Sequence, residues 1–321
     1  MKNSLFLKLI SVLLILASMV TLVACSPDSK GEDEEEMEVS KEGLVFSLAA
    51  NGMGYNLRSA KECIDENIVI PATYTDEKTS QSLPVTSIGV TAFVENKEVK
   101  SIYIPEGVTY IHADAFSECE SLEKIEVSEA NKEFLSVDGC LYTKDGKTLL
   151  KCPQARKEST LSLPDTVVTI SDEAIKNYKN LKTIELNEGL KEIGKFAFSC
   201  CVNLESITFP DSMDTIGEAA FQLCSSMRSV TFGSGFKTRD TFNGEGEVTK
   251  YVQEVGKFAF YFCDDIANIK YNGTVADFEA LNIDVSCFLS TVLTDKVECT
   301  DGLMTLPKLE GKLELPAYIG Q

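Results

Sequence analysis

The sequence predicts a repeat solenoid that is rich in β-structure, with short parallel strands joined by turns and short helical segments. The main observation is a motif that returns at a fixed spacing: "IGKFAFSCCVNLESITFP" begins at Ile193, and "IGEAAFQLCSSMRSVTFG" begins 23 residues later at Ile216. Six related copies begin at Ile88, Ile111, Ile170, Ile193, Ile216 and Val255. A repeat period in the twenties is typical of solenoids.

The apolar positions of the copies form columns, which is the second observation. One column contains Ala92, Ala115, Ala174, Ala197, Ala220 and Ala259, and the next contains Phe93, Phe116, Ile175, Phe198, Phe221 and Phe260. The end of each copy reads apolar-x-x-apolar-x-apolar, and its last part has the period-2 alternation of a short strand. The strand part supplies two further columns. The first contains Ile102, Ile125, Ile184, Ile207, Val230 and Ile269, and the second contains Ile104, Val127, Leu186, Phe209, Phe232 and Tyr271. The Ala–Phe step predicts a turn or a single helical turn, and neighbouring copies must supply the core because one copy cannot bury its own apolar side.

Two irregular spacings predict insertions into the solenoid, which spans residues 88–272. The step from Ile111 to Ile170 is 59 residues, so about 36 residues are extra, and we place this insertion at about 128–163. The step from Ile216 to Val255 is 39 residues, which predicts a protruding polar loop at about 237–252. Solenoid ends must be covered to stay soluble. We therefore expect an N-terminal cap at 44–87, a C-terminal cap at 273–302 and a short tail at 303–321.

The repeat pattern resembles a known family. The run I-G-x-x-A-F-x-x-C-x-x-L-x-x-I-x-F-P in Ile193–Pro210 is similar to the BspA-type leucine-rich repeat of bacterial surface proteins, and the resemblance covers roughly residues 44–302. The segment "VDGCLYTKDGKTLLKCP" (Val137–Pro153) resembles a hairpin found in that family. The resemblance implies a solenoid with a strand face and a turn-rich face, and a cell-surface binding or adhesive role without shared catalytic residues. Departures from the pattern are Ser171 and His112 at the Gly position and Gly233 at the Pro position.

The N-terminus has the features of an export signal. Lys2 and Lys8 precede an apolar run, and the run ends in "LVAC" at Cys25. This order indicates a lipoprotein signal peptide at 1–24, with lipid on Cys25 as the mature first residue. An ordinary secreted protein and an uncleaved anchor helix are the alternatives. We expect an extracytoplasmic protein, anchored by lipid to a bacterial membrane and exposed at the cell surface; a bacterium with one membrane and one with two both fit.

An acidic segment, 25–43, follows and includes "GEDEEEMEV". It has too few apolar residues to fold, and its like charges extend it, so it predicts a tether. The net charge is −20 for the whole chain, and −22 once 1–24 with Lys2 and Lys8 is removed. Nucleic acid is therefore not an expected partner.

The chain has 11 cysteines, and Cys25 is assigned to lipid. Cys119, Cys201, Cys224 and Cys263 share one repeat column. We expect these to be buried free thiols, because stacked neighbours have parallel Cβ directions that a disulfide does not favour. Cys140 and Cys152 flank the expected hairpin and form the candidate disulfide, although a two-residue Asp145–Gly146 turn would pair Cys140 with Lys151 instead. Cys287 and Cys299 are a weaker candidate pair.

The sequence contains no pattern that indicates catalysis. His112 is the only histidine and is expected in a turn, and the close Cys/His spacing of a metal site is absent from the sequence. The 50 acidic residues make carboxylate pairs inevitable by chance, so they do not indicate a glycosidase. We expect no catalytic residues, no metal and no cofactor.

Between the apolar strand positions lie columns that differ from copy to copy, and their side chains should point away from the core. The candidate binding face comprises Lys100, Tyr103, Glu123, Glu126, Lys182, Glu185, Glu205, Thr208, Arg228, Thr231 and Lys270. Extended surfaces of this kind are what solenoids use to bind. The sequence thus predicts non-catalytic recognition of an extracellular protein or glycan in an adhesive role. A structural or assembly lipoprotein of the cell's own envelope is the alternative, and an envelope hydrolase that uses Asp or Glu is a further one.

Overall fold

The computed structural model of the protein describes residues 42–236, 239–242, 248–251, 255–281, 283, 285–288 and 294–306. The expected signal peptide, Cys25, the tether up to residue 41 and the residues after Leu306 lie outside this range. Every described residue belongs to a single structural unit, residues 38–321. Within the described ranges, no helix has the length and apolar character needed to cross a bilayer.

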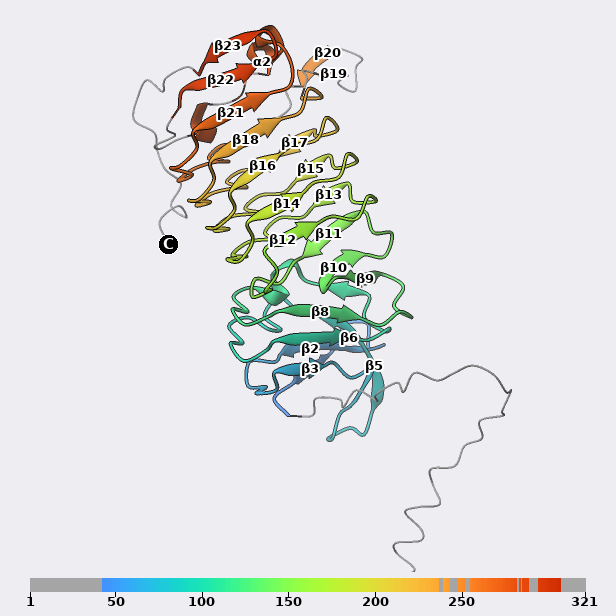
Figure 1. Cartoon of the computed structure of the whole chain (residues 1–321). Coiled ribbons are helices and arrows are strands. Elements are labelled where there is room, and N and C mark those ends of the chain that lie inside the picture. Colours follow the sequence, from blue (N-terminus) through green and yellow to red (C-terminus); the bar gives the residue numbers. More distant parts are fainter. Residues whose placement is uncertain are drawn as a thin grey trace, which may run out of the picture. The chain divides into compact units, whose positions relative to one another are not determined.

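The strands that end each repeat form one series of parallel ladders, which we call the strand face (Figure 1). In chain order it contains β3 (Asn67–Val69), β6 (Ser101–Ile104), β8 (Lys124–Val127), β12 (Thr160–Ser162), β14 (Thr183–Glu185), β16 (Ser206–Thr208), β18 (Ser229–Phe232), β21 (Asn268–Tyr271) and β22 (Lys296–Cys299). Residues of one sequence column are paired: Ile102 lies opposite Ile125, and Val230 lies opposite both Ile207 and Ile269. The predicted solenoid of short parallel strands is confirmed.

The isoleucines that open the repeats form parallel ladders on the other side of the core. One ladder contains β13 (Thr169–Ile170), β15 (Glu192–Ile193) and β17 (Thr215–Ile216), and a bridge from Ile216 to Val255 continues it, whereas β7 (Tyr110–Ile111) belongs to the sheet of the N-terminal end. At its N-terminal end stand β1 (Val45–Leu48), β2 (Tyr55–Ser59), β4 (Thr73–Thr75) and β5 (Ser82–Ile88). Here β5 pairs in parallel with both β2 and β7. The segment expected as a cap thus joins the ladders directly.

The turn that carries the Ala–Phe step is also hydrogen-bonded from one coil to the next. Phe198 donates its backbone N–H to Ala220 C=O, and Phe221 donates to Ala259 C=O, each at 2.7 Å. The flanking residues Phe196 and Cys200 have left-handed backbones, with φ of 54° and 62°. Residues other than glycine seldom adopt such φ values, so the ladder bonds must hold these turns in place.

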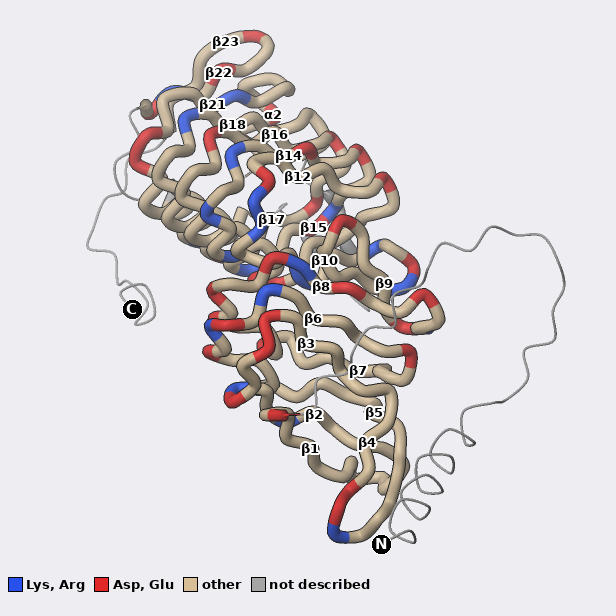
Figure 2. The backbone as a smooth tube through the Cα atoms, turned by 60° about the horizontal axis from the view of Figure 1, so that its bottom comes forward, with Lys and Arg blue, Asp and Glu red and all other residues tan. Residues whose placement is uncertain are grey.

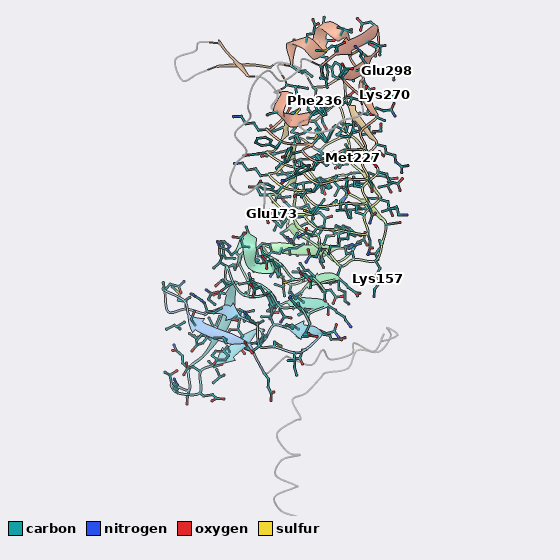
Figure 3. All side chains as sticks on the ribbon, turned by 90° about the vertical axis from the view of Figure 1, so that its left-hand side faces the viewer. Lys157, Glu173, Met227, Phe236, Lys270 and Glu298 are labelled. Atoms are coloured by element: carbon teal, nitrogen blue, oxygen red, sulfur yellow. The ribbon has the colours of Figure 1, made fainter. Side chains whose placement is uncertain are left out.

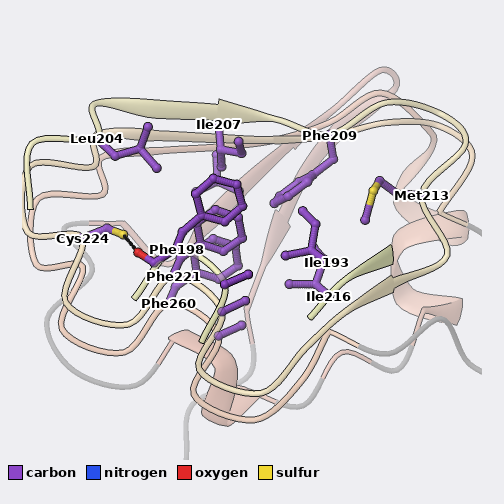
Figure 4. Close-up of a cluster of buried hydrophobic side chains, with 14 of the residues drawn as sticks. Ile193, Phe198, Leu204, Ile207, Phe209, Met213, Ile216, Phe221, Cys224 and Phe260 are labelled. Carbon is purple, nitrogen blue, oxygen red and sulfur yellow. Dashed lines mark hydrogen bonds between the residues drawn. The ribbon is translucent and has the colours of Figure 1, made fainter. Parts of the chain in front are cut away.

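The core lies between the two ladders and the turns, and its most regular feature is a stack of phenylalanine rings (Figure 4). Neighbouring ring centroids in the series Phe198, Phe221, Phe260 and Phe288 are 4.8, 5.3 and 5.1 Å apart, with planes tilted by 7 to 8°. Stacked rings of this kind contribute about 0.5–1.5 kcal/mol per pair beyond the area that they bury. The Phe column of the sequence is therefore a physical stack of side chains.

The long insertion contains a coil that the sequence did not reveal. Leu161 of β12 lies opposite Ile184 of β14, so β12 is a repeat strand. Cys152 donates its N–H to Ala174 C=O in the same way that Ile175 donates to Ala197, so Cys152 occupies the Phe column of this coil. The coil was overlooked because a cysteine occupies the Phe column, so that its strand residues are the main sign of the repeat.

The remainder of that insertion is a hairpin, as the resemblance implied. It consists of β9 (Phe134–Val137), β10 (Cys140–Thr143) and β11 (Thr148–Lys151), and β11 pairs in parallel with β13. Tyr142 lies opposite Leu149, as a two-residue turn requires, but Leu141 lies opposite Lys151 because of an irregularity in the register. The register that a regular two-residue turn would give, with Cys140 opposite Lys151, is therefore not adopted: one extra residue in β11, at Leu150, moves Cys140 towards Cys152, the candidate partner.

The second insertion and the C-terminal end also contain more structure than expected. The backbones of β19 (Arg239–Phe242) and β20 (Val248–Tyr251) pair as an antiparallel hairpin in the segment expected to be a loop. Downstream, α2 (Val275–Ala280) begins at a capping box formed by Thr274 and Asp277. The 3-10 helix η3 (Val285–Phe288) corresponds to η2 (Ala113–Phe116) of an earlier coil, because Cys287 C=O accepts from Phe260 N–H as Ala115 C=O accepts from Phe93 N–H. Strand β23 (Gly302–Thr305) pairs with β22 and extends three residues beyond the expected end of the cap.

Replacement of Phe221 by alanine tests the ring stack. Phe221 is fully buried between Phe198 and Phe260, so the F221A variant should lose about 3–5 kcal/mol of unfolding free energy, measured by urea denaturation. The control is V202A, at a position that is 36% exposed, which should change the value by less than about 0.5 kcal/mol. Equal losses in the two variants would contradict the importance of the stack.

Candidate binding surface

The structure places the eleven candidate residues on the outer side of the strand face, and none of them is buried. Lys100, Lys182, Glu185, Glu205, Thr208, Arg228 and Lys270 are exposed, while Tyr103, Glu123, Glu126 and Thr231 are half-buried. Figure 3 shows Lys157, Lys270 and Glu298 projecting from one side of the stack, and Glu173 from the opposite, turn-rich side. The varying columns therefore lie on one outer side of the stack, whereas the repeated columns face inwards.

Parallel register brings candidate residues of different repeats side by side. Tyr103 lies opposite Glu126, and Thr208, Thr231 and Lys270 follow one another along three neighbouring strands. Glu185 accepts a hydrogen bond of 3.0 Å from Ser162 Oγ on the adjacent strand. Acidic and basic residues are interspersed on this side of the stack (Figure 2).

Several charged residues of this surface form ion pairs with their neighbours. Lys124 Nζ is 3.0 Å from Glu126 Oε1, Lys157 Nζ is 2.8 Å from Glu123 Oε2, and Lys270 Nζ is 3.2 Å from Glu298 Oε2. These side chains are about one-third to three-quarters exposed, and exposed pairs contribute little to stability. Their charges thus remain available to a partner.

The strand face is interrupted between β8 and β12. The two coils are joined by a 3.0 Å bond from Ala155 N–H to Leu122 C=O, but within the described residues β8 and β12 do not pair. The β9–β10 hairpin lies against β8 instead, with Ile125 N–H donating to Gly139 C=O at 2.9 Å. A cavity of about 580 Å³ remains, which we call the strand gap.

The strand gap is a polar, charged site. Its lining residues are Glu123, Lys124, Glu126, Ser136, Asp138, Gly139, Arg156, Lys157, Glu158, Thr160, Leu161 and Ser162. Only Glu123 and Glu126 of these were candidates from the sequence. Lys124 lies in a recognised repeat but outside the selected columns, and the remaining residues lie in the insertion whose coil was not recognised. The spacing of Leu161 and Leu163, 23 residues before Ile184 and Leu186, is the signal that could have revealed them.

Arg156 is the buried cation of this site, with a side chain only 7% exposed. Its guanidinium donates to the backbone carbonyl of Asp138 and to Tyr178 Oη at 3.3 Å, and it lies 3.5 Å from Glu158 Oε2. It also lies 3.5 Å from Cys140 Sγ. A buried cation needs such partners, and here they fix the hairpin to the coil that follows it.

The cysteines of the repeat column are buried free thiols, as expected. Each donates its S–H to a backbone carbonyl of the preceding coil; for example, Cys201 donates to Ile175 at 3.2 Å and Cys224 to Phe198 at 3.2 Å. Burial raises the pKa of the Cys119 and Cys201 thiols to about 12. They therefore remain protonated at neutral pH and act as small core residues rather than nucleophiles.

The candidate disulfide pair is close in space but not bonded. Cys140 and Cys152 are both free and buried, and their Sγ atoms are 2.8 Å apart. Burial is the main cause that raises the pKa of Cys152 well above its ordinary value. The disulfide remains a prediction. Cys287 and Cys299 are likewise free thiols.

His112 caps a short helix. Its Nδ1 accepts a 3.2 Å hydrogen bond from Asp114 N–H at the start of η2, which agrees with the expected turn role. In the part of the chain that the structure describes, no group of three or more His, Cys, Asp or Glu side chains is arranged to hold a metal ion.

A stack of parallel coils with a varied strand face and a uniform core defines a leucine-rich-repeat solenoid. The family model "BspA type Leucine rich repeat region" matches six copies in this chain, over residues 73–137, 154–245 and 244–308. The chain therefore belongs to the BspA-type leucine-rich-repeat family. No curated protein matches it.

Solved structures of leucine-rich repeat proteins are similar to this chain to different extents. A leucine-rich repeat protein from Eubacterium ventriosum has a TM-score of 0.52 and 24% identity, and the match covers 67% of this chain and 52% of that one. This chain thus spans about half the length of that relative. A leucine rich cell surface protein from Faecalibacterium prausnitzii has a TM-score of 0.38 and 16% identity, and covers 77% and 98% of the two chains. The T. pallidum leucine-rich repeat protein has a TM-score of 0.37 and 19% identity, and covers 78% and 90%.

Oxidation tests the Cys140–Cys152 pair. Oxidised glutathione, added during refolding, should join the two sulfurs by thiol–disulfide exchange and raise the unfolding free energy by about 3 kcal/mol, because the bond closes a short loop. Urea denaturation with and without reductant, with mass spectrometry of the linked peptides, measures both effects. The C152A variant should lose the dependence on reductant and C201A should keep it. A wild-type chain that remains fully reduced would contradict the prediction.

Proposed function

We propose that this protein is a non-catalytic binding protein, anchored at the bacterial cell surface by lipid on Cys25. Its strand face recognises an extracellular protein or glycan in an adhesive role. The observation that carries the proposal is the difference between the two kinds of column. The inward columns repeat, whereas the outward columns change from coil to coil and remain exposed or half-buried. Membership of a family of bacterial leucine-rich-repeat proteins supports it.

The charge and geometry of the surface favour contacts at many points along the strands. Acidic and basic residues are interspersed on neighbouring strands, and the exposed ion pairs can exchange partners at little cost. Many copies anchored on one surface would then add avidity to a modest single-site affinity. A lipid anchor and an extended acidic tether would present the solenoid away from the membrane.

Joint replacement of four strand-face residues tests the recognition surface. The full chain in mild detergent is probed against matrix proteins, mucins, envelope proteins and glycans at physiological salt. The Tyr103→Ala, Glu126→Ala, Glu185→Ala, Arg228→Ala variant should bind its target at least tenfold more weakly. The control replaces Lys195 and Lys257, exposed residues of the turn side, by alanine and should bind within about threefold. Unchanged binding by the fourfold variant would rule out the strand face.

Replacement of Cys25 tests the anchor. The C25A chain should leave the membrane fraction and lose incorporation of a labelled fatty acid, because the acyl chains supply the membrane affinity. Fractionation of expressing cells and fatty-acid labelling measure this, and C200A, a half-buried cysteine of a repeat, should behave as the unaltered chain. Retention of C25A in the membrane would favour an uncleaved anchor helix.

A further inference from the structure

We propose that the strand gap is where the partner is held, and that its occupant is an extended, basic peptide segment of a partner protein. The segment would pair through its backbone with the open edge of β12. This inference rests on the proposed binding function and names the partner's chemistry and its place on the strand face.

The edge of β12 is open towards the gap. On its other side, Thr183 N–H donates to Ser159 C=O and Leu163 N–H donates to Glu185 C=O, so residues 159, 161 and 163 face β14. In a parallel ladder alternate residues face opposite sides, so the backbone N–H and C=O groups of Thr160 and Ser162 face the gap. Among the described residues these backbone groups have no hydrogen-bond partner. Such an edge is a template for another strand.

Strand β8, on the opposite side of the strand gap, does not pair with this edge. The N–H groups of β8 that face the gap are already bonded: Ile125 N–H donates to Gly139 C=O at 2.9 Å, and Val127 N–H donates to Ser136 Oγ at 3.3 Å. The hairpin that supplies these acceptors is itself fixed by the bond from Arg156 to the Asp138 carbonyl. The gap is therefore held open before a partner arrives, which lowers the entropic cost of binding.

The size and lining of the gap select the chemistry of the occupant. Its volume of about 580 Å³ lies within the range of preformed ligand sites. Four carboxylates (Glu123, Glu126, Asp138 and Glu158) and three cations (Lys124, Arg156 and Lys157) line it, and Glu185 lies on the next strand. This excess of negative charge, in a chain of net charge −20, favours a segment that carries Lys or Arg.

The lining also discriminates against a glycan. Its twelve residues include no aromatic side chain on which the apolar face of a sugar ring could stack. The polar groups that converge on the gap include main-chain donors and acceptors at the spacing of a strand, and these match a peptide backbone. An extended peptide is therefore the occupant that the structure favours.

The test uses the full chain in mild detergent and a display library of random linear octapeptides. Selected peptides should be basic, and their affinity should fall at least tenfold for the S162P variant, because proline removes the N–H that faces the gap. Proline is tolerated at an edge position of this kind, and thermal melting checks that the variant is folded. The matched variant S162A keeps the N–H and should bind within threefold. Methylation of alternate backbone nitrogens of the peptide should also weaken binding tenfold.

A second measurement does not depend on any variant. Hydrogen exchange of the fragment that contains Thr160–Ser162 should slow at least tenfold when the peptide is bound. Selected peptides that bind S162P and S162A equally and leave this exchange unchanged overturn strand addition. Strand addition is also overturned if the library yields no binding peptide. The same holds if a glycan, and no peptide, slows hydrogen exchange of this fragment. In each case the proposed function would still stand if the chain binds an array target and the fourfold strand-face variant does not. If the chain binds no array target at all, both the proposed function and strand addition are overturned.

Discussion

The parallel register between successive coils is the constraint on which the rest of the structure depends. A 23-residue period places equivalent side chains directly above one another, so the apolar strand residues of successive coils pair and one phenylalanine ring stacks on the next. The same register aligns the backbone groups of both ladders and of the left-handed turns between them. No single coil could satisfy these groups or bury its apolar side alone, so stability arises between coils.

The same constraint explains why the missing pairing between β8 and β12 alters both the core and the surface. At the hairpin, the Phe column contains Cys152 instead of an aromatic residue, and the core divides into two clusters. Leu141 packs in one cluster, whereas its neighbours Cys140 and Tyr142 pack in the other. The hairpin thus fills the core at the joint, yet it also keeps β8 and β12 apart on the outer side. A charged gap with one open strand edge results.

Core and surface are therefore subject to different requirements in every repeat. An inward side chain must match the residue above and below it, because close packing penalises both cavities and excess volume. An outward side chain contacts solvent and its neighbours through weak ion pairs, so its identity is nearly free of folding constraints. This freedom allows the strand face to vary from coil to coil while the scaffold remains constant. Recognition at the strand gap would combine this variable surface with backbone pairing at β12.

The sequence by itself determined the solenoid, the two faces of each strand and the column of buried thiols, because each follows from a local pattern repeated at a fixed period. It could not determine the register of the hairpin, where one extra residue at Leu150 brings Cys140 and Cys152 together. It also concealed the coil of Leu161, since Cys152 interrupts the Phe column. The strand gap was decided by tertiary structure alone. It arises from the competition between hairpin and repeat strand for the edge of β8, and such competition over distant segments leaves no local pattern in the chain.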